Sequence, residues 1–310
     1  MKPNKEDIAR MAAGAVIMLL VFLVVFHFYQ KQNPAAQLAS KASRVDLVSR
    51  MRLALASASE AEKSAVLATT DQDSQTFADQ ARAAATEVEQ ERQELGGLLK
   101  SEATQGEKDL FSQFSELFAE FRRIDDELLN LAVKNTNIKA YGLAFGPAAA
   151  AINEMITALS RLIASTAGSP EEKQVMILVY GAEISALHLQ TLLPPHIAEE
   201  SDQTMDKLEA LMSGDDKRIR KNLKELAALP KLNRNADLAA AASSHARFSK
   251  IKTQILALSR ENTNVKSLSI SLNQKRKVML LGQETLNKLQ QAILEEPIAG
   301  VTYGRPPRPR

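Results

Sequence analysis

The sequence of 310 residues contains no cysteine and no tryptophan, and aromatic residues make up only 5% of it. The lack of cysteine excludes disulfides, thiolate metal ligands, haem attached through cysteine and cysteine nucleophiles. The residues that dominate the chain, Ala, Leu, Glu, Lys and Gln, are typical of helices that pack through small side chains. We therefore predict an all-α fold.

The sequence also lacks the usual signs of nucleic-acid binding and of catalysis. Its formal net charge is +2, and basic and acidic residues are interleaved without forming a continuous basic stripe. It has no Walker loop, dinucleotide fingerprint or Gly-x-Ser-x-Gly motif, and its four histidines form no Glu-x-x-His pair. We expect no nucleic-acid partner, no metal, no cofactor and no enzymatic activity.

One long uncharged run, Met11 to Tyr29, stands near the N-terminus. Its nineteen residues, at about 1.5 Å of rise each, approach the ~30 Å hydrocarbon core of a bilayer, which predicts a transmembrane helix. A cleaved signal peptide is the alternative, but the run is long for a signal core, and bulky Phe26, His27 and Phe28 stand where small residues are expected. We assign residues 1–32 to a cytoplasmic head and an anchor in the bilayer.

Basic residues flank this run on both sides, so their distribution does not orient it. We expect the short head to stay inside and the long C-terminal part to be exported, because large domains cross membranes largely regardless of charge.

Apolar residues recur at helical spacing along almost all of the remaining chain. Asn135-Thr136-Asn137 interrupts the pattern. The apolar phase continues past it, which allows one helix of about 60 residues, but Asn and Thr favour caps and turns, so we predict a reversal there. Pro147 predicts a kink in the next helix, and Pro194-Pro195 predicts the end of a later one.

The strongest boundary lies at Gly168 to Glu172, where glycine closes one helix and Ser169-Pro170 begins the next. We predict two up-and-down four-helix bundles at residues 33–168 and 169–295, followed by a basic, proline-rich tail at residues 296–310. The arginines of the tail suit anionic lipid or an acidic partner surface, and simple disorder is the alternative.

The chain aligns with itself after a shift of 127 residues. Asn135-Thr136-Asn137 falls on Asn262-Thr263-Asn264, and Lys139 falls on Lys266. Because core positions match over about 40 residues, we interpret the body as two modules of one design, with both turns far from the membrane. His245 takes the place of Phe118, which favours a partly buried core histidine over a metal ligand.

The segment from Leu128 to Leu162, LLNLAVKNTNIKAYGLAFGPAAAAINEMITALSRL, resembles the four-helix-bundle sensor domain of methyl-accepting chemotaxis receptors. The resemblance rests on the turn residues, on Lys139-Ala140 and on the returning helix, and it occurs once per repeat. It implies a bundle outside the bacterial inner membrane that forms homodimers and binds small ligands or a liganded binding protein. Unlike those receptors, the sequence shows no second span, HAMP linker or methylated hairpin after residue 295, so we expect it to act through another membrane protein.

Two groups of residues are candidates for binding a ligand or a partner. The paired Asn-Thr-Asn-x-Lys turns would present their side chains at the distal tip, although helix capping also explains these residues. Charged residues of the first body helix would line a pocket at a dimer interface, as in the family, although a solvated face also explains them. The candidates are Asn135, Thr136, Asn137, Lys139, Asn262, Thr263, Asn264 and Lys266 at the turns, and Arg50, Arg52 and Lys63 on the first body helix.

The sequence thus predicts a single-pass protein of the bacterial inner membrane with a periplasmic body of chemoreceptor sensor type. A structural or scaffold subunit of a membrane complex, without a ligand, is the alternative, because an alanine-rich bundle with no evident polar pocket suits it equally well.

Overall fold

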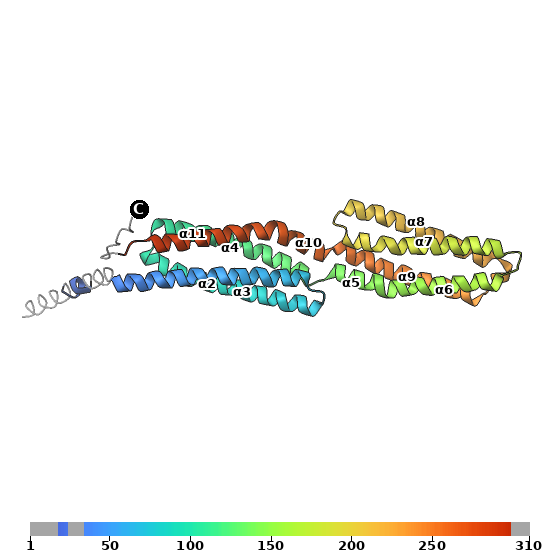
Figure 1. Ribbon diagram of the computed structural model, residues 1–310, viewed down its shortest axis with the longest axis horizontal. Helices are drawn as coiled ribbons and strands as arrows, with labels where there is room; N and C mark the ends of the chain where they lie inside the picture. The colour runs from blue at the N-terminus through green and yellow to red at the C-terminus, as the bar shows by residue number, and fades with distance from the viewer. Residues whose placement is uncertain (1–17, 24–33, 299–310) are drawn as a thin grey trace, which may run out of the picture. The chain divides into compact units, whose positions relative to one another are not determined.

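The computed structural model describes residues 18–23 and 34–298, and among these residues every regular element is a helix (Figure 1). The all-α prediction is therefore confirmed. Most of the predicted anchor, Met11 to Tyr29, lies outside the described residues, as does nearly all of the predicted tail.

The first half of the body contains α2 (Pro34–Leu67), α3 (Asp71–Glu102), α4 (Gln105–Ala132), α5 (Thr136–Leu143), the π-helical turn η1 (Ala144–Ala148) and α6 (Ala149–Thr166). The second half contains α7 (Glu172–Ala198), α8 (Asp202–Ala228), the 3-10 turn η2 (Pro230–Leu232), α9 (Ala236–Glu261), α10 (Thr263–Ile270), the π-helical turn η3 (Ser271–Lys275) and α11 (Arg276–Glu295).

The two halves repeat the same succession of elements 127 residues apart. Starting points agree at α5 and α10 (136 and 263), at η1 and η3 (144 and 271), and at α6 and α11 (149 and 276). Asn135 and Asn262, which precede α5 and α10, both adopt the left-handed conformation, with φ of 50° and 54°. The duplicated sequence thus folds into duplicated local structure.

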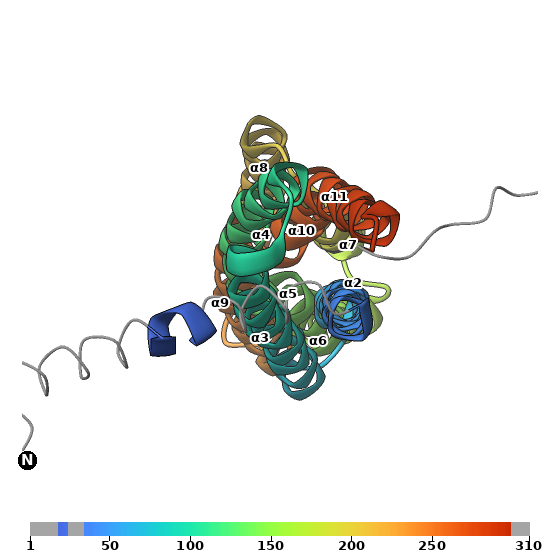
Figure 2. The ribbon, with the colours of Figure 1, turned by 90° about the vertical axis from the view of Figure 1, so that its left-hand side faces the viewer.

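The described chain divides into two compact units. The first unit comprises residues 34–60, 80–123 and 276–298, and the second comprises residues 61–79 and 124–275. In the first unit, buried side chains of α2, α3, α4 and α11 share one core, and Figure 2 shows these helices around a common centre. In the second unit, the core is shared by α6, α7, α8 and α9, with contributions from α5 and η1.

Each unit therefore takes its fourth helix from the other repeat. The repeat that begins with α2, α3 and α4 ends with α6, whose Ile152, Met155 and Leu159 lie in the core of the second unit. The repeat that begins with α7, α8 and α9 ends with α11, whose Leu286, Leu289 and Ile293 lie in the core of the first unit. This division differs from the predicted boundary at residues 168 and 169, which falls within the second unit.

The difference begins at Asn135, where the predicted reversal of the chain does not occur. Instead of folding back along α4, the chain continues into α5 and then α6, which packs against α7 and α9. Backbone hydrogen bonding resumes at once, since the N–H of Lys139 donates to the carbonyl of Asn135 at 3.0 Å. A single left-handed residue interrupts the hydrogen-bond ladder without producing a hairpin.

The predicted helix end at Pro194-Pro195 is wrong, whereas the kink at Pro147 stays a prediction. Pro147 lies in the π-helical turn η1, whose wider turn accommodates the missing N–H donor. Pro194 and Pro195 do not end α7, which continues to Ala198.

Two described stretches, Gln105–Thr166 and Glu172–Ala198, are long and apolar enough to cross a membrane by length and composition. Both supply buried residues to the bundle cores, and core helices of soluble proteins pass the same test. They are therefore weak evidence for further spans.

Candidate functional site

The two Asn-Thr-Asn segments, residues 135–137 and 262–264, hydrogen-bond to each other in a nearly symmetric arrangement that we call the clasp. The N–H of Thr136 donates to Oγ1 of Thr263 at 3.2 Å, and the N–H of Thr263 donates to Oγ1 of Thr136 at 3.1 Å. The N–H groups of Asn137 and Asn264 each donate to the Oδ1 of the other asparagine, both at 3.1 Å. These side chains accept hydrogen bonds from backbone N–H groups that have no partner in the helix, because the helical hydrogen bonding is interrupted at Asn135 and Asn262.

The side-chain amides of the clasp reach the neighbouring segments. Nδ2 of Asn137 donates to the carbonyl of Ile197 at 2.6 Å and to Oδ1 of Asn262 at 2.7 Å. Nδ2 of Asn262 donates to the carbonyl of Glu199 at 2.7 Å. The clasp therefore also holds the end of α7.

Asparagine suits the first position of each segment, because it tolerates the left-handed region better than most residues. Neither Asn135 nor Asn262 makes a side-chain cap hydrogen bond, so capping does not explain them. Asn135, Thr136, Asn137, Asn262 and Thr263 are buried. The predicted exposed tip is therefore wrong, and the clasp is an internal junction.

The lysines that follow the clasp remain exposed at its edge. Nζ of Lys139 lies 2.9 Å from Oδ2 of Asp71 and donates to the carbonyl of Lys134 at 2.8 Å. The hydrogen bond from Lys139 holds the pKa of Asp71 below its ordinary value. Lys266 repeats the backbone contact, since its Nζ donates to the carbonyl of Glu261 at 2.8 Å.

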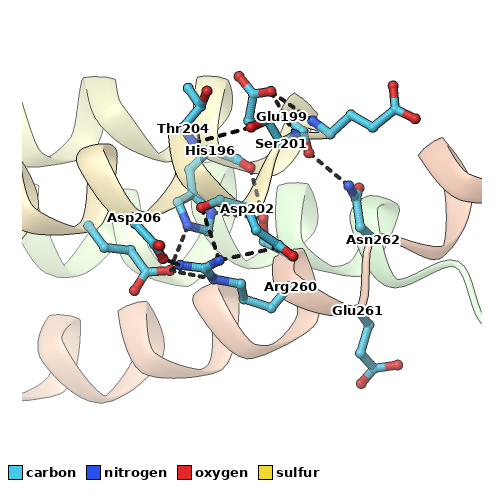
Figure 3. A network of polar contacts seen from close by, with 12 residues as sticks. His196, Glu199, Ser201, Asp202, Thr204, Asp206, Arg260, Glu261 and Asn262 are labelled. Carbon is cyan, nitrogen blue, oxygen red and sulfur yellow. Dashed lines mark hydrogen bonds and ion pairs between the residues drawn. The ribbon is translucent and has the colours of Figure 1, made fainter.

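A polar network that the sequence did not predict lies beside the clasp (Figure 3). His196 is fully buried, with Nδ1 2.8 Å from Oγ of Ser259 and Nε2 2.9 Å from Oε1 of Glu209. Arg260 also donates to Glu209, through Nε at 2.8 Å, and pairs with Asp206. No local motif marks these residues, because they come from α7, α8 and α9.

Both ring nitrogens of His196 take part in hydrogen bonds of this network. The hydroxyl of Ser259 donates its one proton to the carbonyl of His196 at 2.9 Å, so Nδ1 must donate to Ser259. Burial raises the pKa of Glu209, but hydrogen bonds from Arg260 and His196 outweigh this effect and hold it below its ordinary value. Glu209 is therefore an ionised acceptor at the centre of the network.

The predicted core histidine, His245, is buried and lies in another network of the second unit. Its Nε2 is 3.0 Å from Oδ1 of Asp216, which also faces Lys252 at 3.7 Å and Arg220 at 2.8 Å through its two oxygens. Burial lowers the pKa of His245, and the neighbouring Asp216 opposes this shift only in part.

Replacing His245 by phenylalanine, the residue of the other repeat, should reduce the acid sensitivity of folding. A folded-state pKa below the unfolded value, about 6.5, means that stability is present above that pH and is lost as pH falls below it. Urea unfolding at about pH 7.5 and about pH 5.5 should show a smaller loss of unfolding free energy in His245→Phe than in the parent chain. Equal losses would show that His245 does not titrate differently in the folded state.

An open groove of about 450 Å³ lies between α3 and α4 of the first unit. Two arginines, two glutamates and two serines supply polar groups, and Phe118 contributes an apolar surface; the polar residues are Arg92, Arg122, Glu89, Glu116, Ser112 and Ser115. Arg92 makes a two-fold hydrogen bond to Glu89, at 2.8 and 2.7 Å, which holds the pKa of Glu89 below its ordinary value. Arg122 is exposed, and its charge contributes to the lowered pKa of Glu89.

The three charged candidates of α2 do not converge within one chain. Arg50 lies 3.2 Å from Asp46 and 3.7 Å from Glu91, whereas Nη1 of Arg52 donates to Gln290 of α11 at 2.9 Å. Lys63 is exposed and belongs to the second unit. A pocket formed by these residues with a second chain stays a prediction.

A buried charge cluster in the second unit also escaped the sequence prediction. Lys275 of η3 pairs with Asp125 of α4, and its Nζ lies 3.3 Å from Oε2 of Glu62 on α2. All three residues are almost completely buried. The equivalent of Lys275 in the other repeat is Ala148. A lysine at a position that is apolar in the other repeat was the one feature of the sequence that could have indicated this cluster.

Within the part of the chain that the structure describes, no group of three His, Asp or Glu residues is arranged to hold a metal ion.

Part of the chain matches a known family model. Residues 44–172 match the family model described as the four helix bundle sensory module for signal transduction. The match extends over α2 to α6 and so covers the first repeat. No curated protein sequence matches the chain.

Proposed function

We propose that the chain is the sensing body of a membrane signalling system, because residues 44–172 match the family model described as the four helix bundle sensory module for signal transduction. It binds a small molecule or a partner protein and passes the resulting change to another membrane protein. The family match carries this proposal, and the duplicated helices support it because the second repeat has the same succession of elements.

We propose the groove between α3 and α4 as the site for a small ligand. Its volume of about 450 Å³ suits a small molecule. Arg122 offers a guanidinium group, Ser112 offers a hydroxyl group, and Phe118 offers an apolar contact. We therefore propose a ligand that carries an anionic group on a small apolar body.

A thermal-shift screen of anionic metabolites on the full chain in mild detergent tests this proposal. A ligand present at one hundred times its dissociation constant should stabilise the folded protein by about 2.7 kcal/mol. Arg122→Ala should abolish the shift. Arg123→Ala is the matched control, because Arg123 is the neighbouring exposed arginine and pairs with Glu120 instead of lining the groove. No shift from any compound, or equal shifts in both variants, would contradict the ligand or its site.

The scaffold alternative predicts a different result from affinity capture in mild detergent. A scaffold subunit should be recovered with one complex in fixed stoichiometry and without a ligand effect. A sensor should be recovered with its membrane partner in an amount that depends on the ligand.

We further propose that the body lies in the periplasm, held by the segment Met11 to Tyr29 in the inner membrane. Periplasmic placement is typical of the sensory modules that residues 44–172 match. Protease added to intact spheroplasts should digest the body. Complete protection of a membrane-bound chain would contradict this placement.

A further inference from the structure

Charged side chains connect the end of α11 with the first turns of α2 and the start of α4, all at one end of the first unit (Figure 1). Arg44 of α2 donates through Nη1 to Oε2 of Glu107 on α4 at 2.9 Å, and through Nη2 to Oε2 of Glu296 at 2.6 Å. Nζ of Lys41 donates to the carbonyls of Leu294 and Glu296 at 2.5 and 2.7 Å. We call Lys41, Arg44, Glu107 and Glu296 the latch.

The buried pair of the latch is only partly satisfied. Arg44 and Glu107 are 3% and 0% exposed, yet Nε of Arg44 and Oε1 of Glu107 have no hydrogen-bond partner within the described residues. The N–H of Thr104 donates to the other oxygen of Glu107, Oε2, at 3.2 Å. Burial raises the pKa of Glu107, and the charge of Arg44 opposes this shift only in part. Arg44 therefore serves two carboxylates with one hydrogen bond each.

A second arrangement of the guanidinium would satisfy Glu107 completely. Arginine and carboxylate groups frequently pair through two parallel hydrogen bonds. Such a pair forms if Nη2 of Arg44 turns from Glu296 to the unpartnered Oε1 of Glu107. The side chain of Glu296 is 23% exposed, so water can replace Arg44 there more easily than at the fully buried Glu107. The two carboxylates thus compete for one donor, Nη2.

We infer that the latch is a two-state switch, in which Arg44 either holds the end of α11 through Glu296 or releases it by pairing fully with Glu107. The first state is the one in the structure. Helix α2 begins shortly after Met11 to Tyr29, the proposed anchor, and α11 is the last helix of the second repeat. Release would change the contact between the end of the body and the segment that leads to the membrane. This role in regulation rests on the proposed signalling function.

Hydrogen exchange at the last turn of α11, residues 293–296, tests the switch in the full chain in mild detergent, because amide exchange reports local opening. Glu296→Gln should raise the exchange rate about tenfold, since α11 loses a charged hydrogen bond. Glu107→Gln should lower it at least about threefold, because the competing carboxylate loses its charge and Nη2 stays with Glu296. Glutamine can keep the capping contact that Glu107 makes with Thr104.

The opposite signs of the two effects separate a switch from a static network. Glu295→Gln, at the exposed neighbouring position, is the control and should leave the exchange rate unchanged. Thermal melts should show all three variants folded. Faster exchange in both Glu296→Gln and Glu107→Gln, or no effect of Glu296→Gln, would overturn the switch. The measurement uses no ligand, so its failure can be told apart from the failure of the ligand screen.

Discussion

Replacing Asn137 with alanine should lower the free energy of unfolding by about 3 kcal/mol. The side chain of Asn137 satisfies three groups, namely the carbonyl of Ile197, Oδ1 of Asn262 and the N–H of Asn264. A buried polar group left without a partner costs about 1–3 kcal/mol, and partial relaxation keeps the total for the three groups near the lower end of the summed range. Urea unfolding of the full chain in mild detergent measures this loss.

Two further variants identify the cause of the Asn137→Ala effect. Asn153→Ala, at an exposed position of α6, should change stability by no more than about 0.5 kcal/mol. The double variant Asn137→Ala/Asn264→Ala should lose less than the sum of the single losses, because the two residues share hydrogen bonds. A loss below about 1 kcal/mol for Asn137→Ala would mean that the clasp contributes little to stability.

Replacing Lys275 with alanine should destabilise the protein by about 3–5 kcal/mol, because it leaves Asp125 and Glu62 buried without their cation. Lys277→Ala, at an exposed position two residues later, is the control. Denaturant unfolding of both variants measures the difference.

The triple variant Lys275→Met/Asp125→Leu/Glu62→Leu distinguishes the effect of unpaired buried charges from the effect of lost packing. Replacing a whole buried ion cluster by apolar residues is often neutral or stabilising, so this variant should recover most of the stability lost in Lys275→Ala. Equal losses in the single and triple variants would show that packing, and not the unpaired carboxylates, causes the effect.

Much of the fold was predictable from the spacing of apolar residues. Phe114, Phe121, Ile124 and Leu128 follow one heptad stripe, and all four are buried. The self-alignment at a shift of 127 residues also corresponds to matching element boundaries. These features are local, since a stripe depends only on the helical period of its own segment.

The exchange of fourth helices was not predictable in this way. The stripe of α6, with Ile152 and Leu159, shows that one face is buried but does not show which helices cover it. Asn135-Thr136-Asn137 has the composition of a turn, and only its contact with a segment 127 residues away turns it into a junction. Local patterns therefore located the elements but did not assign their partners.

The candidate sites were predicted less well for the same reason. The sequence indicated the residues of the clasp but placed them at an exposed tip. It indicated neither His196 nor Lys275, because their partners come from other helices. The groove between α3 and α4 likewise requires Arg92 and Arg122 on adjacent helices.

The two repeats meet at the clasp and contribute a helix to each other's bundle. The double variant Thr136→Cys/Thr263→Cys tests this arrangement most directly, because the two Oγ1 atoms lie 3.2 Å apart and the chain has no cysteine of its own. Mild oxidation of the folded protein should give an intramolecular disulfide that makes the chain migrate faster on a non-reducing gel. Two free thiols in the folded, oxidised protein would contradict the clasp and favour separate tandem bundles.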